Sequence, residues 1–313
     1  MPLVSVIIPT HNRNSLLVRA VKSVLAQTCS SCEIIIVDDY GDADMALREF
    51  GDRVHYIRIP RTPYPAESRN VGMKYAHGNY IAFLDDDDTW LPDKLSTQVQ
   101  VFSDHPETAL VCSDAYIVKP GTQAKPELLY LNNRNGKTGF LLDELINNNF
   151  VITSTCMVRR DALQKTGGFS TDPSFRGIED YELWLRIARQ FQMQYMPVPL
   201  AVYQDAEGSL RSEISRLRYH DGINRMYSTL QSELPATDQY TATHKRLTGK
   251  IYENNVGKLC LLLEMGDKVH FSTLFRDLIV AHPFLTPKMC VSVSRTYIRQ
   301  MITGMAKNRK CSG

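Results

Sequence analysis

Short hydrophobic runs alternate with amphipathic segments through residues 3–104. Each run ends in a cluster of polar residues, a pattern typical of buried strands; the runs lie at residues 3–8, 33–37, 54–59 and 80–84. Apolar residues recur at helical spacing between and after these runs, over residues 14–25, 66–76 and 92–104. Strands that alternate with helices in this way predict a doubly wound α/β sheet that is mostly parallel.

The pattern is less regular after residue 105 and becomes helical after residue 210. In the middle part we expect a long loop over 119–138 and short helices beginning near 159 and 178. Strands are expected over 109–118 and 150–158, and two short strands separated by Pro197 and Pro199 are expected over 192–203. Helices are predicted near 211–231, 240–265, 267–280 and 288–308. The chain is therefore predicted to have two domains: a mixed α/β domain over 1–210 and a C-terminal helical region over 211–313.

The composition is that of an ordinary soluble globular protein, with 313 residues of which 43% are hydrophobic and 22% charged. The sequence shows no apolar stretch long enough to span a bilayer and no signal peptide, so we expect a cytoplasmic protein. Seven scattered cysteines fit a reducing compartment. Residues 1–210 hold 20 Lys and Arg against 26 Asp and Glu, a net of −6, whereas residues 211–313 hold 16 against 8, a net of +8.

Four consecutive aspartates, Asp85 to Asp88, directly follow the hydrophobic run at 80–84. Adjacent carboxylates raise each other's pKa unless a cation lies among them, and a site with only oxygen ligands suits Mg²⁺ or Mn²⁺. The motif therefore favours a divalent metal site in which phosphate oxygens fill the open positions. The alternative is a solvated acidic turn that caps the next helix.

Two other polar clusters follow strands that are expected to lie in the same sheet. One is the segment from Thr10 to Arg13, and the other is the pair Asp38 and Asp39. The carboxyl ends of parallel strands meet at one edge of the sheet, so these clusters and the aspartates are expected to form one site. No Gly-x-Gly-x-x-Gly motif follows the first strand, so a dinucleotide cofactor is not supported.

An acidic pair, Glu179 and Asp180, lies in the first turn of the helix expected from residue 178. The positive end of the helix dipole favours acidic residues there, which is a purely structural explanation. The functional explanation is a general base, because a carboxylate can take the proton of a substrate hydroxyl. The sequence pattern alone leaves both explanations open.

These motifs together resemble the family 2 glycosyltransferases, and the resemblance covers about residues 3–210. It rests on six segments in the order typical of the family: Val4-Ser5-Val6-Ile7-Ile8-Pro9-Thr10-His11-Asn12-Arg13, Ile36-Val37-Asp38-Asp39, Ser68-Arg69-Asn70-Val71-Gly72, Phe83 to Asp88 with Trp90-Leu91-Pro92, Gly167-Gly168-Phe169, and Glu179-Asp180 with Leu183-Trp184-Leu185-Arg186. The resemblance implies a GT-A fold and an inverting sugar transfer from a nucleotide diphosphate sugar, most often a uridine one.

The resemblance also implies roles for individual residues. For the donor, Pro9, His11 and Arg13 would line the nucleoside pocket, and Asp39 would accept a hydrogen bond from the base. Arg69 would reach the base or the diphosphate, and Asp86 would lie near the ribose. Asp85 and Asp87 match the Asp-x-Asp positions, with Asp87 as the direct ligand of Mn²⁺ or Mg²⁺. Asp180 matches the general base with Glu179 beside it, and Gly167, Gly168 and Phe169 would border the acceptor.

One segment departs from the family pattern. The family often has Tyr-Arg-x-His-x-Gly-Ser after the last strand, whereas this chain has Tyr203-Gln204-Asp205-Ala206-Glu207-Gly208-Ser209. The Arg and His are therefore missing, which puts a histidine contact to metal or phosphate in doubt. Asp205 or His220 would be substitutes, although nothing in the sequence shows it.

The expected function is the metal-dependent transfer of a hexose or N-acetylhexosamine to a hydroxyl of a glycan or lipid-linked oligosaccharide in bacterial-type surface polysaccharide synthesis. The alternatives are a sugar-nucleotide-binding scaffold that has lost catalysis and, with less support, a nucleotidyltransferase. The basic amphipathic helix at 288–308 would contact the anionic inner face of the cytoplasmic membrane, or it would simply pack on the first domain. A nucleic-acid partner is not expected, because no basic platform with interleaved aromatic residues is present, and a homodimer is left open.

Overall fold

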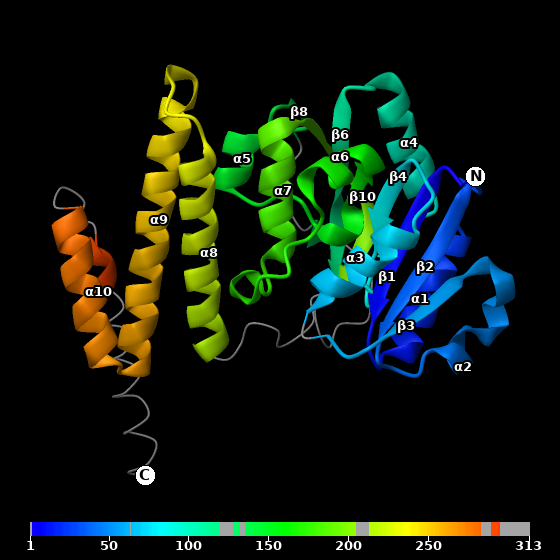
Figure 1. Cartoon of the computed structure of the whole chain (residues 1–313), viewed down its shortest axis with the longest axis horizontal. Helices are drawn as coiled ribbons and strands as arrows, with labels where there is room; N and C mark the ends of the chain where they lie inside the picture. Colours follow the sequence, from blue (N-terminus) through cyan, green and yellow to red (C-terminus); the bar gives the residue numbers. More distant parts are fainter. Residues whose placement is uncertain are drawn as a thin grey trace, which may run out of the picture. The chain divides into compact units, whose positions relative to one another are not determined.

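The computed structural model describes residues 2–62, 64–118, 128–129, 131, 135–204, 213–282 and 289–294 (Figure 1). Contacts within the chain divide it into two compact units, Met1–Glu207 and Gly208–Gly313. In the part of the chain that the structure describes, no helix is long and apolar enough to cross a membrane.

The first half of the first unit is regular and parallel. Four strands lie in the order β3-β2-β1-β4 and all pair in parallel: β1 (Val4–Thr10), β2 (Cys32–Asp39), β3 (His55–Ile59) and β4 (Tyr80–Phe83). Helix α1 (Asn14–Leu25) connects β1 to β2, and α3 (Pro65–Tyr75) connects β3 to β4. A short helix, α2 (Asp44–Leu47), and a 3₁₀ segment, η1 (Arg48–Arg53), lie between β2 and β3 and were not predicted.

The second half of the first unit makes the sheet mixed. The order continues from β4 through β9 (Met157–Arg159), β6 (Thr108–Val118) and β10 (Gln192–Gln204) to β5 (Thr89–Trp90). Strands β6 and β10 pair in parallel, whereas β9 pairs antiparallel with both β4 and β6. Two short strands, β7 (Leu128–Leu129) and β8 (Lys137–Gly139), pair antiparallel with β6 and β10. The predicted α/β class with a mixed, mostly parallel sheet is confirmed.

Several element boundaries differ from the prediction for local reasons. The helix expected from residue 92 begins at Lys94 as α4 (Lys94–Asp104), and before it Trp90 pairs with Ala201 in the sheet. Strand β10 is continuous, and Pro197 and Pro199 are accommodated by irregular register rather than by a break. Part of the loop expected over 119–138 lies outside the described residues, but β7 and the start of β8 fall within it.

The strand expected over residues 150–158 is wrong for most of its length. Only Met157–Arg159 is a strand, and the residues before it form a 3₁₀ turn, η2 (Thr153–Thr155). Hydroxyl side chains compete with a strand ladder for backbone hydrogen bonds, and here the Thr155 hydroxyl donates to the Ile152 carbonyl at 2.9 Å. This turn is important for the site described below.

Helices cover both faces of the sheet. Apolar residues of α1 and α4 pack against one face, which includes Val6, Ile8 and Leu84. Helix α3 lies against the other face, where Gly72 contacts Ile7 so closely that a Cβ added at Gly72 would lie 2.5 Å from Ile7 Cγ2. Later in the chain follow α5 (Leu142–Asn147), α6 (Arg160–Thr166), η3 (Pro173–Phe175) and α7 (Glu179–Gln190), of which α6 and α7 match the predicted helices.

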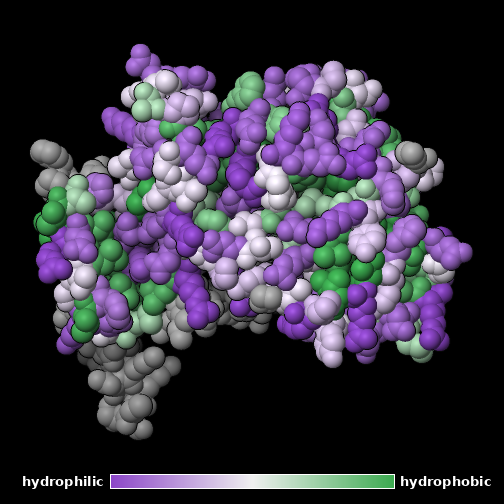
Figure 2. Space-filling view, viewed as in Figure 1, coloured by the Kyte–Doolittle hydropathy of each residue, from purple (hydrophilic) through white to green (hydrophobic). Residues whose placement is uncertain are grey.

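The second unit consists of helices in the part that the structure describes. These are α8 (Glu213–Glu233), α9 (Asp238–Met265) and α10 (Lys268–Ala281), close to the predicted bounds. Tyr252, Leu259 and Leu278 belong to a small core between α9 and α10, while Val269 and Val280 of α10 are exposed. Figure 2 shows that hydrophilic residues cover most of the visible face, with smaller hydrophobic areas among them. Of the helix predicted over 288–308, residues 289–294 are helical and the remainder lies outside the described residues.

Candidate active site

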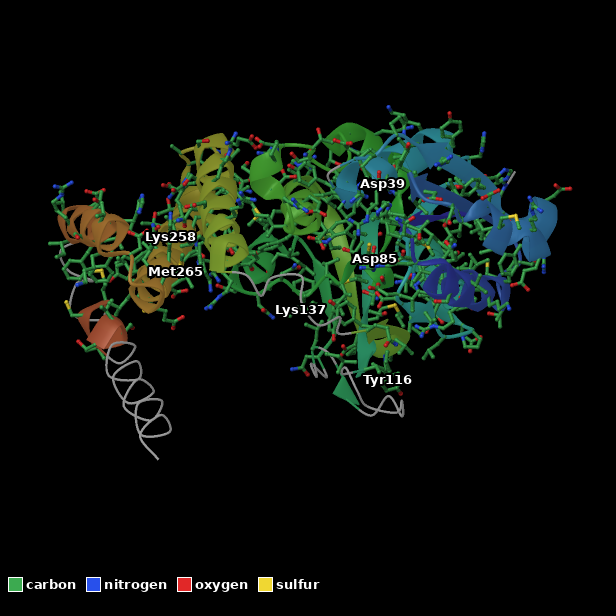
Figure 3. The ribbon with its side chains drawn as sticks, turned by 90° about the horizontal axis from the view of Figure 1, so that it is seen from below. Asp39, Asp85, Tyr116, Lys137, Lys258 and Met265 are labelled. Atoms are coloured by element: carbon green, nitrogen blue, oxygen red, sulfur yellow. The ribbon has the colours of Figure 1, made fainter. Side chains whose placement is uncertain are left out.

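Three strand ends of the first unit carry the polar clusters singled out in the sequence. Thr10 ends β1 opposite Asp38 of β2, and Asp85 follows shortly after β4. Figure 3 labels Asp39, the last residue of β2, and Asp85, which follows β4. The Thr10 hydroxyl donates to Asp86 Oδ2 at 2.7 Å, which joins the first cluster directly to the aspartates.

At the β1–β2 end, His11 and Asp39 are linked through the backbone. His11 Nδ1 lies 2.6 Å from the Asp39 carbonyl oxygen, so this nitrogen carries the proton and donates. The Asp39 carboxylate accepts hydrogen bonds from the Thr62 backbone N–H and from Arg61, each at 2.5 Å. Pro9 lies half-buried in β1 beside these residues. Two adjoining residues, Asn12 and Tyr40, have positive φ angles of 53° and 61°, a conformation that is unusual for side chains larger than glycine.

Asp86 and Asp87 share one arginine. Arg13 Nη1 lies 3.1 Å from Asp86 Oδ1 and 3.0 Å from Asp87 Oδ2. Burial raises the pKa of Asp86 to about 6, and burial together with the charge of Asp85 raises the pKa of Asp87. Added positive charge at this loop would therefore stabilise the ionised carboxylates.

Arg69 lies between the aspartate loop and the acidic pair of α7. Its guanidinium is buried, with Nη2 2.6 Å from Asp85 Oδ1 and Nη1 3.5 Å from Glu179 Oε1. Burial works against its charge, but Asp85 and Glu179 hold the pKa of Arg69 above its ordinary value. Burial raises the pKa of Glu179. The structure thus pairs Arg69 with two carboxylates, a contact that the resemblance did not imply.

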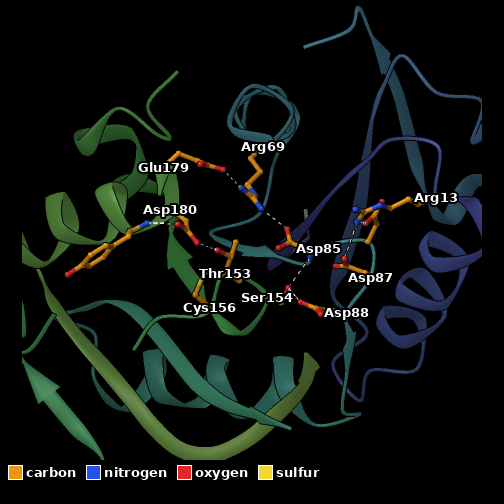
Figure 4. Close-up of polar contacts among 12 residues, drawn as sticks. Arg13, Arg69, Asp85, Asp87, Asp88, Thr153, Ser154, Cys156, Glu179 and Asp180 are labelled. Carbon is orange, nitrogen blue, oxygen red and sulfur yellow. Dashed lines mark hydrogen bonds and ion pairs between the residues drawn. The ribbon is translucent and has the colours of Figure 1, made fainter. Parts of the chain in front are cut away.

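Asp180 is held from a different element. Its Oδ2 accepts from the Thr153 hydroxyl of η2 at 2.7 Å, and its Oδ1 accepts from the Tyr181 backbone N–H at 2.7 Å (Figure 4). Next to Thr153, the Ser154 hydroxyl donates to Asp88 and accepts from the Asp85 N–H at 3.1 Å. The position of Asp180 in the first turn of α7 is also the one that the helix dipole favours.

Several residues of this network are not predicted from the sequence. Asp88 belongs to the acidic run, but the sequence predicts no role for it. The residue is buried, and burial raises the pKa of its carboxyl well above the ordinary value. Its Oδ1 accepts from the Gln204 N–H at 2.8 Å. Thr153 and Ser154 were expected in a strand and received no role either. A run of hydroxyl residues directly before a short strand is the only signal that the sequence offers for them.

The Gly167–Phe169 loop is fixed to the rest of the site by side chains. Gly167 ends α6 with φ 83°, and Gly168 continues with φ 74°, where a Cβ would lie 2.8 Å from Asn70 Oδ1. The Asn70 amide bonds both the N–H and the carbonyl of Phe169, at 2.9 and 2.8 Å. Arg186 of α7 donates to the Gly168 carbonyl at 2.7 Å. The loop is therefore held rigidly beside Arg69, whose guanidinium lies 5.3 Å from the Phe169 ring centroid.

The carboxylates after β4 fit a divalent ion whose remaining coordination positions are filled by a substrate. Among the described residues, no group of three or more His, Cys, Asp or Glu side chains is placed to hold a metal ion alone. Asp85 and Asp87 are oxygen donors that remain partly exposed, and Mg²⁺ in particular is commonly bound by one or two carboxylates plus substrate phosphates. Of the proposed substitutes for the missing histidine, Asp205 lies outside the described residues, and His220 Nδ1 lies 2.7 Å from Asn254 Oδ1 in the second unit.

Comparisons with known proteins show which family the chain resembles. The model of glycosyl transferase family 2 matches residues 5–167. An uncharacterized glycosyltransferase of Haemophilus influenzae is 27% identical over 201 residues, which are 60% of this chain and 63% of that protein. The putative teichuronic acid biosynthesis glycosyltransferase TuaG of Bacillus subtilis is 28% identical over 217 residues, 67% of this chain and 82% of its own length. The chain thus spans less than two thirds of the length of the Haemophilus relative.

Two solved structures share the fold at low sequence identity. TarS 1-349 of S. aureus in complex with UDP-GlcNAc has a TM-score of 0.65 at 15% identity and covers 95% of this chain and 89% of its own. The mannosyltransferase PcManGT of Pyrobaculum calidifontis, in complex with GDP-Man and Mn²⁺, has a TM-score of 0.58 at 18% identity, with 96% and 87% covered. The predicted GT-A fold is confirmed.

Proposed function

Because the chain belongs to glycosyl transferase family 2, we propose that it transfers a hexose or N-acetylhexosamine, with inversion, from a nucleotide diphosphate sugar to a hydroxyl of a glycan or lipid-linked oligosaccharide. The observation that carries the proposal is the presence of two separate carboxylate groups in one network. One group follows β4 and includes Asp85 and Asp87, and the other is Asp180 at the start of α7. The first suits a metal and a diphosphate, and the second suits a base.

The donor would bind along the strand ends. Pro9, His11, Arg13 and Asp39 lie where β1 and β2 end and would surround the nucleoside, with Asp86 near the ribose. Asp85 and Asp87 would hold Mn²⁺ or Mg²⁺, which supplies positive charge to the departing diphosphate. The UDP-GlcNAc bound to TarS and the GDP-Man and Mn²⁺ bound to PcManGT support this class of donor, and a uridine donor is preferred on the family pattern.

Asp180 would act on the acceptor. Its carboxylate accepts hydrogen bonds from Thr153 and Tyr181, and each carboxylate oxygen keeps a further lone pair for the acceptor hydroxyl. The proton passes to Asp180 as the acceptor oxygen bonds to the anomeric carbon and the bond to the diphosphate breaks. One base on the face opposite the leaving group gives inversion. The loop Gly167–Phe169 would border the acceptor, with Glu179 fixed beside the base by Arg69.

The relatives support a biological setting. TuaG is named for teichuronic acid biosynthesis, which supports a role in surface polysaccharide synthesis, and we propose that the chain acts at the cytoplasmic side of the membrane. The excess of positive charge in residues 211–313 supports contact with an anionic membrane surface.

The test combines donor binding with one substitution. Thermal shifts with a panel of nucleotide diphosphate sugars, each with and without Mn²⁺, should show one donor whose effect depends on the metal, because a ligand at a hundred times its Kd adds about 2.7 kcal/mol of stability. Transfer from that donor should fall by about 10²–10⁴ in Asp180→Asn, the range of general base catalysis. Equal transfer by Asp180→Asn and the parent protein would refute the assignment of the base.

A further inference from the structure

The turn η2 (Thr153–Thr155) lies between the two carboxylate groups of the site. Its three residues are buried, although each carries a hydroxyl that would otherwise be solvated. Buried hydroxyls need hydrogen-bond partners. The Thr153 and Ser154 hydroxyls donate to aspartates, whereas the Thr155 hydroxyl donates to the Ile152 carbonyl. None of the roles assigned above involves this turn.

Adjacent residues of the turn hold opposite sides of the site. The Thr153 hydroxyl donates to Asp180 Oδ2 at 2.7 Å. The Ser154 hydroxyl accepts from the Asp85 N–H at 3.1 Å and donates to Asp88. Figure 4 shows Thr153 and Ser154 between Asp180 and the aspartate loop. Because the two hydroxyls belong to neighbouring residues, a shift of the turn would move both contacts together.

The backbone of the turn is fixed from the opposite side. Trp90 Nε1 donates to the Ser154 carbonyl and Gln98 Nε2 to the Thr155 carbonyl, both at 2.7 Å. Lys94 Nζ donates to Gln98 Oε1 at 2.7 Å and lies 4.0 Å from the Trp90 ring centroid. These contacts come from β5 and α4, so the turn is anchored to regular elements rather than free to adapt.

We propose that η2 is a positioning element that sets the place of the base relative to the metal-binding loop, with Thr153 as the positioning residue of Asp180. The proposal rests on the proposed function, in which Asp180 takes the acceptor proton. Without the Thr153 hydroxyl, the one hydrogen bond left to the Asp180 carboxylate among the described residues would be that of the Tyr181 N–H, and the carboxylate would be free to rotate. A small misplacement of a reacting group costs much of its contribution, up to about 10²-fold for 1 Å.

The experiment compares three variants of the full chain. Thr153→Val keeps the shape of the side chain and removes the hydroxyl, whereas Thr153→Ser keeps the hydroxyl. Thr155→Val is the matched control, because the Thr155 hydroxyl donates to the Ile152 carbonyl within the turn rather than to an aspartate. We expect kcat to fall about 10-fold or more in Thr153→Val, with the donor KM unchanged within twofold. Thr153→Ser should restore most of kcat, and Thr155→Val should lower Tm without lowering kcat.

Two outcomes would overturn the proposal: kcat of Thr153→Val within twofold of the parent, or an equal loss of kcat in Thr155→Val. In the Asp180→Asn background, Thr153→Val should cause no further loss of kcat. If Asp180→Asn itself transfers normally, the base assignment has failed rather than the contact.

A crystal structure of Thr153→Val tests the contact without any substrate. A displaced Asp180 carboxylate would support the positioning role even if the donor class proved wrong, and an unmoved carboxylate would refute it.

Discussion

The two sides of the site hold their carboxylates by different means. After β4, Asp86 and Asp87 share Arg13, and Asp85 is paired with Arg69. At the start of α7, Asp180 is held by a hydroxyl and a backbone N–H, and no ion pair of Asp180 occurs among the residues that the structure describes. Arginines balance the charge of the carboxylates after β4, whereas neutral hydrogen-bond donors position the Asp180 carboxylate.

The difference matches the two tasks proposed for these sides. A loop that receives a metal ion and a diphosphate must hold several acids close together, and arginines make that tolerable before the ion arrives. A base needs a defined position and a free lone pair, and neutral donors supply the position without adding a full positive charge beside the carboxylate. If this comparison is right, substitutions on the two sides should have effects of different kinds.

Apart from the loss expected for Asp180→Asn, the largest effect is expected on the metal side. Asp87→Asn removes one of the two proposed ligand carboxylates, and we expect the transfer rate to fall by about 10²–10³, as for other losses of transition-state charge stabilisation. The stabilisation of the protein by donor should also lose its dependence on Mn²⁺. Asp93→Asn is the matched control, because Asp93 is an exposed carboxylate shortly after the loop. Unchanged metal dependence in Asp87→Asn would remove Asp87 from the site.

The next effect concerns stability. Arg69→Met leaves Glu179 and Asp85 without their shared cation, and breaking a buried ion pair in this way lowers the free energy of unfolding by about 3–5 kcal/mol. Arg61→Met breaks the pair of an exposed arginine with Asp39, whose carboxylate keeps the Thr62 N–H, and should cost about 1 kcal/mol or less. Both values are measured by denaturant unfolding without substrate.

A double variant separates charge from packing at the same place. Arg69→Met combined with Glu179→Gln removes the buried charge that the single variant leaves unpaired, so it should recover part of the lost stability. No recovery would mean that Arg69 stabilises the unit by packing, for instance on the Phe169 ring, and the description of this side as charge-balanced would fail.

The regular half of the fold was predictable because local patterns determine it. The hydrophobic pattern predicts short buried strands that lead to Thr10, Asp39 and Asp85. Parallel pairing then places the ends of these strands at one edge of the sheet. The predicted roles of these residues remain predictions, but the structure shows contacts such as that between Thr10 and Asp86.

The irregular half depends on contacts that no local pattern encodes. Residues 150–158 have the composition of a strand, yet the hydroxyls of Thr153 and Ser154 contact aspartates 27 and 66 positions away in the chain. No strand was predicted at Trp90, yet this residue joins the sheet beside β10, which lies far along the sequence. Partners of this kind are set by tertiary packing, which overrides the local preference.

Lys94 provides the smallest and most specific test of how charge is held in this unit. It is fully buried and, unlike Asp85, Asp86 and Asp87, has no ion pair among the described residues. Its neighbours are Trp90 and Gln98, with the buried thiols of Cys112 and Cys156 nearby. Burial lowers the pKa of Lys94 to about 7. Between pH 7 and about 10, the unfolded chain therefore holds a proton that the folded protein has lost.

Because the unfolded state then binds more protons, Lys94 makes the folded protein more stable as the pH rises through this range, by about 1.4 kcal/mol per pH unit at most. Below pH 7 the lysine is protonated in both states and this dependence disappears. Unfolding of the parent and of Lys94→Met at pH 6, 7.5 and 9 should show the parent gaining stability relative to the variant only above pH 7. Lys74→Met, at an exposed lysine of α3, should show no such trend. A constant difference for Lys94→Met at every pH would mean that the buried lysine keeps its proton, so that its neighbours balance a full charge as Arg13 and Arg69 do for the aspartates.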